Sequence, residues 1–269
     1  MSLLLVLPVV WVFGYSVCYS LGAVGFLSQG LTSHYWVQAF TGQRLAESVL
    51  YSLFIAAVVT GCSLCLSLCL VCWLDAWRKH GRLVALLCIP LSTPAGVMGF
   101  LVLQIFSRGG VLSRVLHHLG VCSSPDDFPV LVNDANSVGL ILALISGTCP
   151  LLMLYFLRIW QTAKVDDYVQ LATRLGAASG QALRLVAVPM LLRRSPGLLM
   201  LTFAWNFGTW EIPLLLGSQS PRMMSVLIQQ STGQYAPEDR PLAFVFSTVY
   251  LVIVGIATAI FVSRRSGGV

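Results

Sequence analysis

Charged residues are scarce in this chain: they make up 10% of its 269 residues, and Asp and Glu together number 10. An average soluble domain carries about 25% charged residues, so the composition excludes an ordinary soluble protein. The chain also lacks a Gly-x4-Gly-Lys-Ser/Thr loop, which could cradle the phosphates of a nucleotide. Its apolar segments hold no paired Asp, no His-Glu-x-x-His element and no Ser with Lys. No catalytic residue is therefore predicted.

Apolar residues are abundant instead, at 57% of the chain, and the mean hydropathy is +0.84. A helix needs about 20 residues to cross the hydrocarbon core of a membrane. Six blocks reach that length: Leu3–Phe26, Ser48–Leu74, Leu83–Phe106, Val138–Trp160, Gly197–Leu216 and Ala243–Val262. We therefore predict an all-α fold, a polytopic transmembrane helix bundle with six spans in a single domain, residues 1–269.

Basic residues in the connections indicate the orientation. The first span has no basic residue before its apolar run and no small-x-small cleavage site, so we expect a retained helix. Lys and Arg concentrate on the cytoplasmic side of membrane proteins. Here they gather in two connections and after the last span: Arg78, Lys79, Arg82, Arg158, Lys164, Arg174, Arg184, Arg193, Arg194, Arg264 and Arg265. Both termini are therefore predicted to be cytoplasmic, and this bias explains the net charge without a nucleic-acid partner.

Two clusters could suggest a metal site, but neither has ligand spacing. Cys62, Cys65, Cys69 and Cys72 repeat along one face of the second span, where cysteine serves as a small hydrophobic residue, so we expect core packing. A longer loop on the external side contains His117, His118, Cys122, Asp126, Asp127 and Asp134. A solvated loop is the favoured interpretation, and no metal site is predicted.

Prolines inside the spans indicate kinked helices. Pro90 and Pro94 lie in the third span and Pro150 in the fourth. Each removes a backbone hydrogen bond, which helices packed in a bundle tolerate because neighbouring groups satisfy the freed carbonyls. The spans are therefore expected to pack on one another, and kinks favour a cavity between them.

A polar, basic segment separates the fourth and fifth spans, in the loop 161–196. Its residues alternate polar and apolar at helical spacing from Asp166 to Leu185, so we expect an amphipathic helix, a break at Gly176 and Gly180, and a second helix. Pro189 and the sequence 193–196 mark the turn into the fifth span. The first helix should expose an apolar edge formed by Val169, Leu171, Ala172 and Leu175. Either a partner protein or the membrane surface could cover that edge.

The spacing in this segment is similar to the signature of importer-type permeases of the ATP-binding-cassette (ABC) superfamily: Glu-Ala-Ala, three residues, Gly, nine residues, Ile-x-Leu-Pro. Gln170, Leu171 and Ala172 take the first three places, Gly176 the glycine, and Val186, Val188 and Pro189 the last motif. The resemblance extends over nearly the whole chain. It implies a type I ABC importer permease architecture, with both termini inside and the signature in the cytoplasmic loop before the penultimate helix.

In that family the signature loop is a coupling helix that docks in a groove of the cytoplasmic ATPase. The resemblance assigns this contact to Gln170, Leu171, Ala172, Arg174, Leu175, Gly176 and Pro189. Gln170 lacks the charge of the family's usual glutamate, and Leu171 is bulkier than the usual alanine. The implied partners are two ABC ATPase subunits, a second permease subunit that is a paralogue or an identical copy, an extracytoplasmic solute-binding protein and the lipid bilayer. This chain would bind no cofactor itself, since MgATP belongs to the ATPase.

The segment Phe203–Gly217 is similar to the fifth-helix pattern of permeases for polyamines, ferric iron, thiamine, sulfate and related solutes. It contains Glu211, and a carboxylate in an apolar helix is expected to face a water-filled cavity or a partner. One hypothesis places Glu211, with Asn206 and Trp210, along the solute path or its external gate. The alternative is local pairing of Glu211 with Arg222 or with a backbone amide.

The sequence thus predicts a non-enzymatic permease subunit of an ATP-driven importer, multi-pass in a bacterial-type inner membrane. It would form half of the pathway for a small polar or charged solute. A secondary transporter without an ATPase, a membrane-embedded enzyme and a non-transporting scaffold are the alternatives. Dependence of uptake on ATP separates the importer from the secondary transporter.

Overall fold

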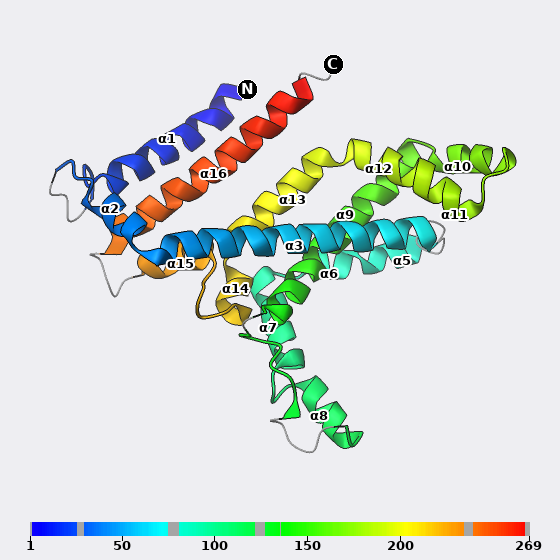
Figure 1. Ribbon diagram of the computed structural model, residues 1–269, viewed down its shortest axis with the longest axis horizontal. Helices are drawn as coiled ribbons and strands as arrows, with labels where there is room; N and C mark the ends of the chain where they lie inside the picture. Colours follow the sequence, from blue (N-terminus) through cyan, green and yellow to red (C-terminus); the bar gives the residue numbers. More distant parts are fainter. Residues whose placement is uncertain are drawn as a thin grey trace. The chain divides into compact units, whose positions relative to one another are not determined.

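The computed structural model describes residues 2–25, 30–74, 81–121, 127–134, 136–233 and 239–266. Every long regular element in these ranges is helical, as predicted (Figure 1). The chain forms two compact units: one contains Met1–Phe54, Phe207–Trp210 and Ser218–Val269, and the other contains Ile55–Asn206 and Glu211–Gly217. The assignment of all residues to one domain stays a prediction.

In the first unit, α1 (Ser2–Ser20) packs along α16 (Arg240–Ser266). Their contact combines apolar and polar groups: Tyr19 stacks on Phe244 with ring centroids 4.1 Å apart, and the hydroxyls of Ser16 and Thr248 are 3.0 Å apart. The helices α2 (His34–Thr41) and α15 (Met224–Ser231) also contact α16. The first turns of α3 (Gln43–Trp73) belong to this unit as well.

The second unit holds the rest of α3 and the helices that follow it. These are α5 (Gly81–Leu86), α6 (Cys88–Ser92), α7 (Ala95–Phe106), α8 (Val111–His118), α9 (Val138–Thr162), α10 (Val165–Arg174), α11 (Ser179–Ala182), η2 (Leu183–Ala187), α12 (Val188–Arg194), α13 (Pro196–Gly208) and α14 (Glu211–Leu216). The last two residues of α13 belong to the first unit. Its apolar core joins the end of α3 to α9 and to the segment after α9, through residues such as Val71, Phe156, Trp160 and Leu191.

Four helical segments are long and apolar enough to cross a membrane, namely Gln43–Trp73, Ala95–His118, Val138–Thr162 and Arg240–Phe261. A fifth is possible if Ser179–Arg194 and Pro196–Gly208, which are bent by 64° at their junction, form one span. The protein is therefore a multi-pass membrane protein. The count of six spans is not confirmed; α1 is a 19-residue helix, but several of its side chains lie outside the described residues.

Two of the predicted spans are broken helices. The third, Leu83–Phe106, is divided into α5, α6 and α7, and Thr93 is extended (ψ 126°) because the residue before a proline is disfavoured in the helical region. The fifth, Gly197–Leu216, is divided between α13 and α14. There Pro213 has no N–H and its ring would clash with the carbonyl of Thr209, which disfavours a straight helix through that point. Pro150, in contrast, lies inside the continuous helix α9.

The cysteine prediction is right for one position of the four. Cys72 is fully buried in the core of the second unit, whereas Cys62, Cys65 and Cys69 are exposed. The face of α3 that carries those three is therefore not core, because it turns away from the packed side. Arg78, Lys79, Cys122 and Asp126 lie outside the described residues, as do the side chains of Arg82, Arg264 and Arg265.

Candidate functional site

The polar segment after α9 contains the residues whose spacing resembles the importer signature. Helix α10 carries Asp166 and Asp167 in its first turn and Arg174 in its last, which is the charge order that a helix dipole favours. It ends in a Schellman motif: Gly176 N–H donates to the Thr173 carbonyl at 3.0 Å, and Ala177 N–H to the Ala172 carbonyl at 3.1 Å. Gly176 has a φ of +97°, which residues with a side chain resist. The predicted break at Gly176 is confirmed.

The predicted break at Gly180 is wrong. Gly180 lies inside α11, within the helical path that continues through η2 into α12. The chain reverses before it, at Gly176 and Ala178, and Ala178 is extended (ψ 146°). A π-helical turn precedes Pro189, which has no N–H to offer the Leu185 carbonyl.

One face of this segment is fixed to the long helices. Val165 at the start of α10, together with Ala187 and Leu191, is fully buried in the core formed with α3 and α9. The Tyr155 hydroxyl on α9 donates to the Arg194 carbonyl at the end of α12, 2.7 Å away. Displacement of α10 would therefore be transmitted to α9 and to the end of α3, because closely packed interiors transmit strain.

The opposite face is exposed and partly apolar. Leu171 is 55% exposed and Leu175 81%, and Gln170, Arg174 and Gly176 are also exposed. Ala172 and Pro189 are half-buried. Val169 was expected on the exposed edge, but it packs against the core instead, because it points to the side of α10 that also carries Val165.

Two exposed apolar residues on this face were missed. Tyr168 is 53% exposed and Leu185 72%. Tyr168 precedes Leu171 by three residues and Leu175 by seven, which is the spacing of a helix stripe, so the pattern could have revealed it. Leu185 joins no such pattern, since it is separated from α10 by the turn at Gly176.

Asn206 lies in a buried polar cluster of the second unit. Its side chain is 1% exposed. Asn206 Oδ1 accepts a hydrogen bond from Thr148 Oγ1 of α9 at 3.1 Å, and Asn206 Nδ2 donates to Thr60 Oγ1 of α3 at 3.3 Å. The Asn206 amide thus joins α13 to α9 and α3 by hydrogen bonds, which is a structural role. A role of Asn206 in the solute path stays a prediction.

Glu211 joins the two broken helices of the second unit. Its Oε2 accepts a hydrogen bond from the backbone N–H of Gly96, 2.8 Å away, in the first turn of α7. The first N–H groups of a helix have no partner within it, and a carboxylate there is also favoured by the helix dipole. Of the two hypotheses, this hydrogen bond favours pairing with a backbone amide. Arg222 instead bonds Gln219 and Gln230.

Trp210, the third residue of the expected path, precedes α14 and is 41% exposed. It belongs to the first unit, whereas Asn206 and Glu211 belong to the second. Within the second unit, the contacts bring Asn206 together with α3 and α9, and Glu211 together with α7. A solute path through these three residues stays a prediction.

No protein-family model matches the chain. It is similar to curated proteins named "Thiamine transport system permease protein ThiP": those of Brucella suis biovar 1 (strain 1330) and Brucella abortus (strain 2308) are each 28% identical to it over 176 residues. The matches cover 65% of this chain, and the chain spans 31% of the length of these relatives.

Proposed function

We propose that this chain is a permease subunit of an ATP-driven importer, because it is similar to permease proteins of thiamine transport systems and the spacing in its polar segment resembles the ABC importer signature. The observation that carries the proposal is α10. It is a short amphipathic helix that exposes Leu171 and Leu175 while its other face is held in the core of the second unit. That arrangement fits a coupling helix.

The exposed face of α10 would dock on an ATPase subunit, and the buried face would transmit the motion. ATP binding closes the ATPase pair, and a ligand shifts a conformational equilibrium by its differential affinity for the two states. A displaced α10 moves Val165 and the core residues that it contacts on α9 and α3. The helical path is also interrupted between α13 and α14, and a break between helices can absorb part of a conformational change.

The remaining assignments belong to the same proposal. Two ATPase subunits hold MgATP, a second permease subunit completes the pathway, and a solute-binding protein delivers the solute on the external side. The α10 segment and both termini lie in the cytoplasm, and the membrane is a bacterial-type inner membrane. Thiamine is the solute to test first because the relatives are named for it, with polyamines, ferric iron and sulfate-like anions next.

The docking assignment is tested with Leu175→Glu. A carboxylate at this exposed position leaves the core of the second unit intact but cannot enter an apolar groove without a desolvation cost. We expect at least tenfold weaker association with the ATPase subunit, measured by co-purification and by ATPase titration. Gln161→Glu is the matched control, since Gln161 is also exposed and lies before α10, and it should bind normally.

The competing interpretation of the same face is a helix lying on the membrane surface. Leu175→Glu would then lower binding of the α10 segment to lipid and leave the ATPase bound at wild-type strength. That result would refute the coupling assignment. A protein that loses its ATPase while its helical content and melting temperature match those of Gln161→Glu would support it.

A further inference from the structure

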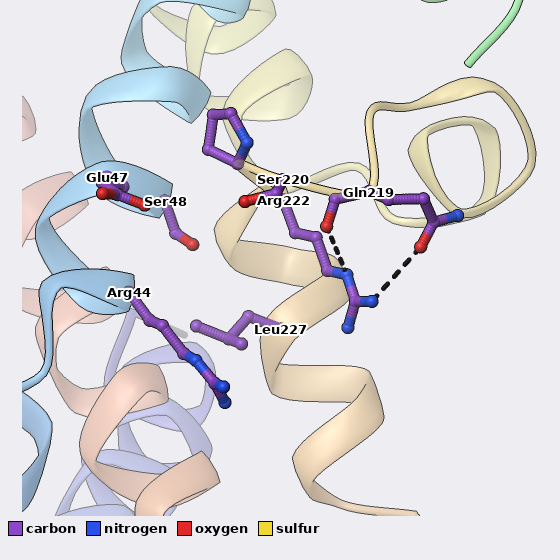
Figure 2. Close-up of a pocket in the computed structure, with 8 residues that line it drawn as sticks. Arg44, Glu47, Ser48, Gln219, Ser220, Arg222 and Leu227 are labelled. Atoms are coloured by element: carbon purple, nitrogen blue, oxygen red, sulfur yellow. Dashed lines mark hydrogen bonds between the residues drawn. The ribbon is translucent and has the colours of Figure 1, made fainter. Parts of the chain in front are cut away.

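A polar cavity lies within the first unit, and none of its lining residues belongs to α10 or to the polar cluster around Asn206. It has a volume of about 230 Å³ and lies between the start of α3 and the segment that leads into α15. Figure 2 shows Arg44, Glu47 and Ser48 of α3 on one side and Gln219, Ser220 and Arg222 on the other. The question is which chemical group such a cavity would hold.

The guanidinium of Arg222 is held in place by neutral groups. Its Nε donates to the Gln219 carbonyl at 2.9 Å, its Nη2 to Gln219 Oε1 at 3.2 Å, and its Nη1 to Gln230 Oε1. These acceptors orient the group without neutralising its charge, and a guanidinium has further N–H donors to offer. Arg222 is also half-buried, so an anion beside it would be screened less than on an open surface.

Unlike Arg222, two other lining residues have no side-chain partner among the described residues. Arg44 makes no ion pair there, although Glu47 lies three residues further along the same helix, and the Ser48 hydroxyl makes no hydrogen bond there. Ser48 is only 3% exposed, and its hydroxyl points toward the cavity (Figure 2). The hydroxyl is therefore free to donate a hydrogen bond to a ligand that enters the cavity.

The walls of the cavity are ordered before any ligand binds. Met224 N–H donates to Ser52 Oγ at 2.8 Å, one helical turn beyond Ser48, and so joins α15 to α3. The Ser218 hydroxyl donates to the Ser220 carbonyl at 2.9 Å and accepts from the Ser220 N–H at 3.2 Å. A site that is already ordered loses less conformational entropy on binding.

We propose that this cavity binds a single carboxylate group, held by the guanidinium groups of Arg222 and Arg44 and by the Ser48 hydroxyl. The lining carries two positive side chains and one negative, so one positive charge is left to balance one carboxylate. Guanidinium and carboxylate form charge-assisted hydrogen bonds in paired geometry. The carboxylate could come from a small free acid or from an acidic side chain of a protein that docks on this face. The site does not depend on the proposed transport function.

The test measures the melting temperature of the purified full chain in lipid nanodiscs, titrated with sodium acetate against sodium chloride at equal ionic strength. We expect a saturable rise with acetate only. Arg222→Gln should raise the half-saturating concentration at least tenfold, and Arg44→Gln several-fold because Arg44 is exposed. Arg193→Gln, an exposed arginine of the second unit, is the control and should leave it unchanged.

Glu47→Gln should change the half-saturating acetate concentration in the opposite direction from the arginine variants. It therefore keeps the test valid if an arginine variant fails to fold. Removing the like charge should lower the half-saturating acetate concentration by about threefold to tenfold. A hexapeptide with one Glu, compared with its Gln counterpart, distinguishes the sources: binding of acetate alone indicates a small acid, and Arg222-dependent binding of the peptide indicates a protein side chain. Equal effects of acetate and chloride, no dependence on Arg222, or weaker binding in Glu47→Gln would overturn the proposal.

Discussion

At the scale of single residues, Gly176 and Gly180 show how one backbone angle separates two similar glycines. Both have open space where a Cβ would stand, with nothing within 4 Å. Only Gly176 has a positive φ, at +97°, whereas Gly180 lies in α11 with no such angle. The requirement for glycine at position 176 therefore comes from its own backbone conformation and not from a clash with residues packed against it.

Alanine at each of these positions tests that distinction. Gly176→Ala should cost about 1 kcal/mol, because a side chain is strained at this φ. Gly180→Ala should stabilise by up to about 1 kcal/mol, since alanine is the better helix former. Thermal denaturation of the two variants in the same nanodiscs measures the difference. If the proposed function is right, only Gly176→Ala also lowers the amount of solute transported per ATP.

Glu211 allows a similar separation of structure from function. Gln keeps an acceptor for the Gly96 N–H, whereas Ala removes it and leaves the first turn of α7 without its cap. Glu211→Ala should therefore lose about 1 kcal/mol of stability and Glu211→Gln less. We expect Glu211→Gln to impair solute transfer while the ATPase stays bound. Wild-type transport by Glu211→Gln would leave the carboxylate only its capping role.

At the scale of elements, the breaks in the apolar helices and the links between them follow from different residues. The apolar helices are interrupted near Pro94, just before α7, and near Pro213, at the start of α14. The hydrogen bond between Gly96 and Glu211 then joins α7 to α14. Gly99 lets α7 approach α14 closely, since a Cβ there would lie 3.2 Å from Leu215 Cδ1. Within the second unit, broken helices are thus held by specific polar and small-residue contacts.

The buried hydrogen bonds of Asn206 can be tested as a set. Asn206→Leu alone should destabilise by about 1 to 3 kcal/mol, because the hydroxyls of Thr60 and Thr148 lose their partner. Replacing both threonines by valine in the same protein should recover most of that loss, since an apolar triple has no unsatisfied group. Chemical denaturation of the single and triple variants measures this. A triple variant no more stable than the single one would contradict a purely structural role for this cluster.

At the scale of the whole molecule, the proposed importer differs from a secondary transporter in its energy source. The chain contains no phosphate loop for a nucleotide, so uptake should need a separate ATPase. The chain would be reconstituted in vesicles with its ATPase and binding protein. We expect uptake of radiolabelled thiamine only when MgATP is present on the side of the membrane that carries the ATPase. Ion gradients should give no uptake without ATP. Gradient-driven uptake in the absence of any ATPase would refute the importer assignment.

The sequence by itself determined the membrane class, the helical fold and the break at Gly176, because these depend on local properties: apolar run length, helical periodicity and a glycine at a helix end. It also indicated which segment resembles the importer signature. It also indicated a kink at Pro90 and Pro94, and the third span is interrupted there, at Thr93. It did not determine the break at Thr209 and Trp210, although Pro213 was visible, because a proline can also be accommodated inside a helix, as Pro150 is.

The tertiary structure decided which side chains meet. Residues 115 positions apart, Gly96 and Glu211, form a hydrogen bond, and Val169 turns into the core while Leu175 two turns later is exposed. It also gathered Arg44, Glu47, Ser48 and Arg222 around one cavity, which no local pattern indicates. Such sites depend on packing between distant helices, and packing is a property of the folded chain as a whole.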